Sequence, residues 1–112
     1  MERPLTSWER EVVGVLAEVE FDGSDIVRDS LDHLVVTGEC ECGCASFNVR
    51  DMRYPAESHH LFHLSNGVSA DSAVGFVLWL GPSGRPISVD VDNTPGVLPD
   101  PKTITASRPV EQ

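Results

Sequence analysis

The sequence predicts an α+β domain in which two N-terminal helices pack on one face of an antiparallel sheet of four or five strands. Apolar residues recur at three- and four-residue intervals only in the first third of the chain, and after residue 34 they alternate with polar residues. A chain of 112 residues is long enough for one hydrophobic core but not for two. We therefore treat residues 1–112 as a single domain.

Two helices are predicted near the N-terminus. Thr6 and Glu9 have the spacing of a capping box, and a helix is expected from there to about residue 18. Its apolar face consists of Trp8, Val12, Val15, Leu16 and Val19, with Glu9 elsewhere. Ser24 and Asp25 are typical of a second helix start, and that helix should reach about residue 33. Its buried stripe is Val27, Leu31 and Leu34, opposite Asp25, Asp29 and Asp32.

From residue 34 the apolar period changes to two. Strands are predicted over residues 34–40, 45–51, 59–64, 74–80 and 87–92. Residues 74–80 are apolar on both faces, as expected of a central strand, and a Gly-Pro-Ser-Gly turn joins them to the next strand. Residues 93–112 carry four prolines and are predicted to be a partly irregular tail without a helix, with Val97, Leu98 and Ile104 as its contacts to the core.

The composition is strongly acidic. Eighteen Asp and Glu against eight Lys and Arg give a net charge of −10, which argues against nucleic acid or an anionic membrane surface as a partner. Eight carboxylates lie between Glu18 and Glu41, with Arg28 the only Lys or Arg among them. A basic protein is the expected partner, with Asp25, Asp29, Asp32, Glu39 and Glu41 as its predicted contacts. Taken by itself, however, the acidic stretch favours a solvated helix face that only maintains solubility.

Other features favour a cytoplasmic protein. Residues 1–4 contain no basic region followed by an apolar stretch, so we expect no signal peptide. The longest apolar run, residues 75–81, is far shorter than the roughly 20 residues that span a bilayer. Three cysteines within five residues do not fit a secreted disulfide framework. Seven of the eight basic residues are arginine, which is typical of high-GC bacterial genomes.

The most unusual motif is the Cys-x-Cys-Gly-Cys run at residues 40–44. A three-residue turn over residues 41–43 would place Cys40 opposite Cys44, close enough for both thiolates to bind one zinc ion. The predicted ligands are Cys40, Cys42, Cys44, His59, His60 and His63. Zinc ribbons and fingers use two separate cysteine turns, and only one is present here. Reduced thiols in a tight turn are therefore favoured, with zinc and a redox switch as alternatives.

No motif indicates catalysis. The sequence contains no GxGxxG, P-loop or GxSxG pattern, so nucleotide binding and α/β-hydrolase chemistry have no supporting signal. A cysteine protease would need a thiolate beside an oriented histidine, and the sequence does not establish that geometry. We expect a protein without enzymatic activity.

Five segments occur in the order LTSWE, FDG, TGECECGCASF, VGFVLWL and LPDP. On these the chain resembles a group of short acidic actinobacterial proteins that have no assigned activity. The resemblance covers most of the chain, is most specific at the cysteine motif and is weakest over residues 52–73. It implies a fold rather than a function. Similar small acidic α+β proteins accompany toxins as immunity proteins, and by that analogy we expect an inhibitor-like interaction module, with a structural zinc domain as the alternative.

Overall fold

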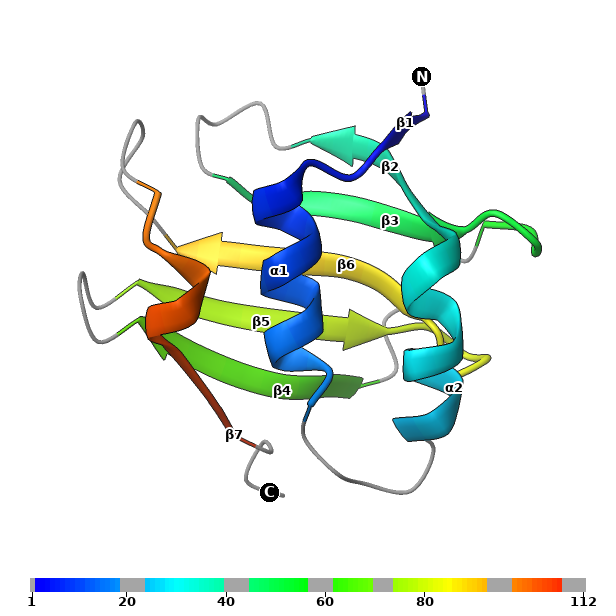
Figure 1. Ribbon diagram of the computed structural model, residues 1–112. Helices are drawn as coiled ribbons and strands as arrows, with labels where there is room; N and C mark the ends of the chain where they lie inside the picture. Colours follow the sequence, from blue (N-terminus) through cyan, green and yellow to red (C-terminus); the bar gives the residue numbers. More distant parts are fainter. Residues whose placement is uncertain are drawn as a thin grey trace.

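The computed structural model describes residues 2–18, 24–39, 45–56, 62–69, 74–92 and 98–107. In chain order the elements are β1 (Arg3–Pro4), α1 (Ser7–Leu16), α2 (Ser24–Ser30), the 3₁₀ helix η1 (Leu31–His33), β2 (Leu34–Glu39), β3 (Phe47–Asp51), β4 (Phe62–Ser69), β5 (Gly75–Leu80), β6 (Pro86–Asp92), the 3₁₀ helix η2 (Pro101–Thr103) and β7 (Ile104–Ser107). Figure 1 shows the strands as one antiparallel sheet, with α1 crossing in front of β5 and β6. The predicted α+β class is confirmed.

The sheet has the strand order β1-β2-β3-β6-β5-β4-β7, and every neighbouring pair is antiparallel. Strands β2 to β6 have five to eight residues each; β2, β3, β5 and β6 lie where the sequence predicts strands, and β4 overlaps the predicted strand only at residues 62–64. The two short edge strands, β1 and β7, have no counterpart in the sequence prediction. The sheet has two parts, β1-β2-β3 and β6-β5-β4-β7. They join where β3 pairs with β6, with Phe47 opposite Val89.

The predicted capping box begins α1. Thr6 Oγ1 accepts a hydrogen bond from Glu9 N at 3.1 Å, and Glu9 Oε1 accepts one from Thr6 N at 2.8 Å, so two free amides of the first turn are satisfied. Val12 and Leu16 are fully buried, as predicted. Val13 is also buried although it lies outside the predicted stripe, because α1 contacts both the sheet and η1.

The second helix is shorter than predicted. It is α-helical only to Ser30, and residues 31–33 tighten into η1 before β2 begins. Val27 is fully buried and Leu31 partly so, while Asp25, Asp29 and Asp32 are exposed, as predicted. Among the described residues, neither helix has the length and hydrophobicity needed to cross a bilayer.

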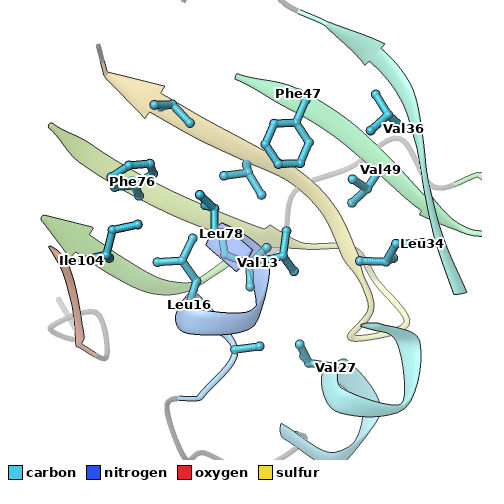
Figure 2. Packing of buried hydrophobic residues seen from close by; sticks show 14 of the residues in the cluster. Val13, Leu16, Val27, Leu34, Val36, Phe47, Val49, Phe76, Leu78 and Ile104 are labelled. Carbon is cyan, nitrogen blue, oxygen red and sulfur yellow. The ribbon is translucent and has the colours of Figure 1, made fainter. Parts of the chain in front are cut away.

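The core joins residues of both helices to alternating residues of the strands (Figure 2). Leu16 of α1, Val27 of α2 and Leu78 of β5 all belong to this cluster and are fully buried. Phe47 and Val49 extend it over β3, since alternate side chains of a strand point to the same face. One continuous core thus links the two helices to the sheet.

The predicted strand at residues 59–64 has different bounds. The structure describes β4 from Phe62 to Ser69, and residues 59–61 lie outside the described part of the chain. The polar stretch Ser65 to Ser69 is held as a strand because its backbone pairs with β5 on one side and β7 on the other. Pairing on two sides overrides the weak strand propensity of this sequence.

The tail is more regular than predicted. A short helix, η2, starts at Pro101, because the first helical position needs no amide hydrogen. Asp100 Oδ1 accepts a hydrogen bond from Lys102 N at 3.0 Å and so caps it. Ile104 is buried, as predicted, and starts β7. Leu98 is expected from the sequence to contact the core, but it is 57% exposed and does not belong to the core cluster. Val97 lies outside the described residues.

Candidate functional site

Two of the acidic residues are buried and belong to the fold. The first is Glu9, whose side chain is 9% exposed and accepts two hydrogen bonds from Arg3, at 2.8 and 2.9 Å. Burial alone would raise the pKa of Glu9, but the hydrogen bonds from Arg3 and Thr6 outweigh it and hold the pKa below its ordinary value. The carboxylate therefore stays charged and ties β1 to the start of α1.

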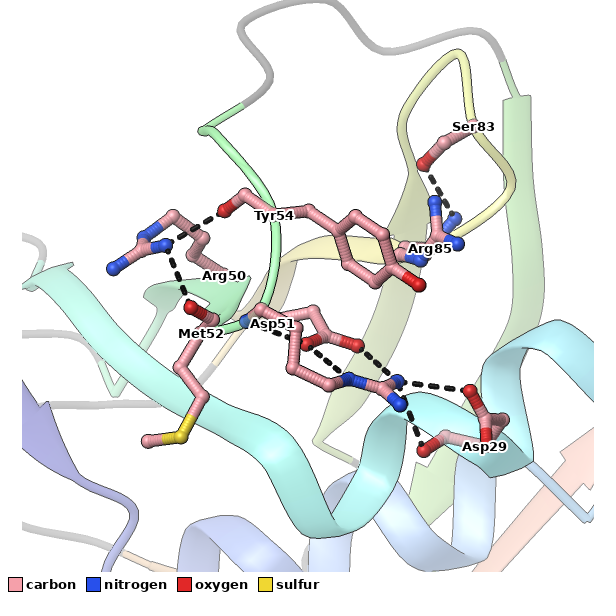
Figure 3. Close-up of polar contacts among 8 residues, drawn as sticks. Asp29, Arg50, Asp51, Met52, Tyr54, Ser83 and Arg85 are labelled. Atoms are coloured by element: carbon pink, nitrogen blue, oxygen red, sulfur yellow. Dashed lines mark hydrogen bonds and ion pairs between the residues drawn. The ribbon is translucent and has the colours of Figure 1, made fainter.

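The second buried carboxylate is Asp51, at the end of β3. Its side chain is 1% exposed, and Arg53 donates to it from Nε at 3.0 Å and from Nη2 at 2.7 Å. These hydrogen bonds hold the pKa of Asp51 far below its ordinary value despite the opposing effect of burial. Arg53 Nη2 also lies 2.8 Å from Asp29 Oδ2, so this cluster fastens the loop after β3 to α2 (Figure 3).

Asp25 and Asp29 of α2 and Asp32 of the adjoining η1, together called the α2 carboxylates, are instead exposed. The Asp29 side chain is 65% exposed and contacts Arg53, and the Asp32 side chain is 78% exposed and lies 2.6 Å from Arg10. No partner for Asp25 is found among the described residues. Exposed ion pairs contribute only about 0–1 kcal/mol because water and salt screen them. The α2 carboxylates thus remain accessible to a binding partner.

Of the other two predicted contact residues, Glu39 does not join them. Glu39 ends β2, with a side chain that is 68% exposed and lies 2.7 Å from Arg3 Nη2. It is five strand positions beyond Leu34, which follows η1, so about 16 Å of extended strand separates it from the α2 end. Glu41 lies outside the described residues.

Most of the predicted metal ligands also fall outside the described part of the chain: Cys40, Cys42, Cys44, His59 and His60. The backbone of His63 is described in β4, opposite Trp79. An uninterrupted three-residue turn would require Glu39 opposite Ala45, but Glu39 pairs with Phe47 after a register shift in β2. The turn itself, residues 40–44, lies outside the described part of the chain, so the zinc site stays a prediction. The residues that are described contain no group of three potential metal ligands.

The sequence does not predict that arginine side chains gather around Tyr54. The Arg85 guanidinium lies over the Tyr54 ring, 3.7 Å from its centroid, and Figure 3 shows the two side chains together. Arg53 is 5.4 Å from the same centroid. A local signal did exist for part of this cluster: Asp51 is in phase with Phe47 and Val49, which predicts a carboxylate on the core face and hence a nearby cation. The pairing of Tyr54 with Arg85 has no local signal.

A hollow of about 140 Å³ adjoins the α2 carboxylates. Leu5, Val13 and Leu31 contribute apolar surface to its lining, and Arg10 and Asp32 contribute charge. Sites for small molecules usually measure roughly 300–1,000 Å³, so this hollow is better matched to one inserted side chain.

Comparisons of the chain with protein-family models, with curated proteins and with solved structures found no match. The resemblance to short actinobacterial proteins accordingly stays a prediction.

Proposed function

We propose that this protein is a non-catalytic interaction module, of the inhibitor or immunity type, whose α2 carboxylates contact a basic protein. The separation of its carboxylates into two sets carries the proposal. Glu9 and Asp51 are buried in ion pairs on which the fold depends, whereas Asp29 and Asp32 stay 65% and 78% exposed. Charges that the fold does not need are available for binding.

Electrostatics favours a basic partner. The net charge of −10 attracts a cationic surface from a distance and repels phosphate backbones. The exposed pairs of Asp32 with Arg10 and of Asp29 with Arg53 contribute little to stability. A lysine or arginine of the partner can therefore replace or join the internal cation at small free-energy cost.

The proposal places both helices on the same face of the sheet, so that their carboxylates gather on one side of the molecule. Leu16 of α1 and Val27 of α2 belong to one core cluster with strand residues, which supports this placement. Exposed Glu11 of α1 and Glu18, in the turn after it, would then enlarge the acidic surface. The proposal also assumes a cytoplasmic protein, as the cysteine usage suggests.

The test compares two charge variants in a pull-down from the native lysate. Asp25→Asn/Asp32→Asn removes two α2 carboxylates, and Asp90→Asn/Asp92→Asn removes two exposed carboxylates of β6 with the same change in net charge. We expect the wild type and the β6 variant to recover the same basic protein, and the α2 variant to lose it. Recovery of no protein, with no toxin gene beside this one, would contradict the proposal.

A further inference from the structure

We propose that Arg85, stacked on Tyr54, is a preformed anchor for one carboxylate side chain of the partner, an inference that rests on the proposed function. The guanidinium lies 3.7 Å from the ring centroid. No carboxylate among the described residues lies within ion-pair distance of it, and its buried Nε has no hydrogen-bond acceptor. Its charge is therefore balanced by an aromatic face rather than by an anion.

The neighbouring arginines differ in this respect. Arg50 pairs with Glu2 through Nε and Nη2, both at 2.8 Å, and donates to the Tyr54 carbonyl at 2.6 Å. Arg53 is held by Asp51 and Asp29. Three arginines thus surround Tyr54, and two of them are already neutralised. Arg85 is the one of the three that no carboxylate of the described residues neutralises, so it is left to bind an anion from outside.

The surroundings suit a binding anchor. The turn before Arg85 is fixed by a hydrogen bond from Gly81 N to Arg85 O at 2.9 Å and by Gly84, whose φ of 86° favours glycine. Tyr54 and Ile26 are each 40% exposed, and Ile26 packs against this turn near Gly84. Arginine and tyrosine dominate binding hot spots, and a stacked guanidinium keeps its outward donors in a fixed fork. Little ordering is required on binding.

The partner must present its carboxylate on a basic surface. A net charge of −10 repels small free anions at long range. It attracts a cationic protein, and a carboxylate on the surface of that protein is thereby brought close to Arg85. The anchor is also connected to the α2 carboxylates, because Arg53 contacts both Asp29 and the Tyr54 ring. One partner surface with lysines facing α2 and a single Asp or Glu facing Arg85 matches both features.

Two capped peptides test the anchor: one with four lysines around a single glutamate, the other with glutamine in its place. Net charge alone predicts that the glutamine peptide binds more tightly. We expect the opposite for the wild type, with the glutamate peptide bound roughly threefold or more tightly. Arg85→Met should abolish this preference, and Tyr54→Phe, which keeps the ring, should retain it. Tighter binding of the glutamine peptide, or an unchanged preference in Arg85→Met, would overturn the anchor.

The same peptides distinguish a failure of the Arg85 anchor from a failure of the proposed acidic binding surface. Salt-sensitive binding of the glutamine peptide that is lost in Asp25→Asn/Asp32→Asn reports on the acidic surface, and the glutamate preference reports on Arg85. An NMR titration of the unmodified protein with the glutamate peptide gives a second readout. The Nε–H signal of Arg85 should shift saturably and that of Arg53, already paired, should not. Equal responses of the two signals would also overturn the anchor.

Discussion

Asp51 shows how a single residue links sequence, packing and electrostatics in this protein. It follows Phe47 and Val49 in the alternation of β3, so the strand points its carboxylate toward the core. An unpaired buried carboxylate would be strongly unfavourable, and Arg53, two residues further on, supplies the compensating charge. Because Asp51 and Arg53 are only two residues apart, their ion pair holds the loop after β3 in place.

Replacement of Asp51 by asparagine should destabilise the fold by about 1–3 kcal/mol at neutral pH, because the buried charge pair is broken. The pKa of Asp51 is lowered in the folded state, so its contribution is present above the unfolded value near pH 4 and is lost as the pH falls below it. The difference between wild type and Asp51→Asn in urea unfolding should therefore shrink at about pH 3.

Asp29→Asn is the control for that measurement, since the Asp29 side chain is 65% exposed. Its free energy of unfolding should stay within about 0.5 kcal/mol of the wild type. A loss as large as that of Asp51→Asn would show that the two sets of carboxylates are not distinct.

Part of the candidate site can be predicted from sequence. The helical phase of Asp25, Asp29 and Asp32 is a local property, and it correctly predicts their exposure. Glu39 is close to them in sequence but lies at the far end of β2, because a strand rises about 3.3 Å per residue. Tyr54 and Arg85 come together from two loops, and no periodicity relates them.

At the level of elements, the tail is the instructive case. Its prolines predict that it contains no helix, yet Pro101 occupies a first helical position, where proline is well tolerated. The four residues of β7 are too few to show a period, and their pairing with β4 is a long-range contact. Trp8 Nε1 adds a further link by donating to Pro99 O at 2.8 Å, which joins α1 to the tail.

Ile104→Ala should therefore cost about 2–4 kcal/mol in urea unfolding, because it opens a cavity where β7 meets the core. Leu98→Ala, also in the tail but at a site that is 57% exposed, should change stability by no more than about 0.5 kcal/mol. Equal effects of the two substitutions would mean that β7 does not contribute to the core as described.

The cysteine motif carries the alternative prediction, a structural zinc site with Cys40, Cys42 and Cys44 as ligands and a histidine as the fourth. Protein made without a histidine tag should then contain about one zinc per chain, and a chelator should lower its melting temperature. Metal-free protein with three titratable thiols and an unchanged melting temperature would exclude the site. Cys40 and Cys44 would in that case be packing residues of the hairpin.

For the whole molecule, periodicity predicts the α+β class and four of the five longer strands, β2, β3, β5 and β6, because each is a local pattern. It does not predict that β6 inserts between β3 and β5, or that the two ends of the chain form the sheet edges, β1 and β7. Those features depend on pairing between distant segments. Net charge is likewise a property of the whole chain, and it does not distinguish buried from exposed carboxylates.

The most direct test of the central claim is the salt dependence of binding to the recovered basic partner, measured by titration calorimetry. Between about 50 and 300 mM NaCl, the affinity of the wild type and of Asp90→Asn/Asp92→Asn should fall roughly tenfold or more, as screening weakens exposed charge pairs. Asp25→Asn/Asp32→Asn should bind weakly already at low salt. Equal affinities of the two charge variants, or an affinity that salt does not change, would contradict a docking surface built on the α2 carboxylates.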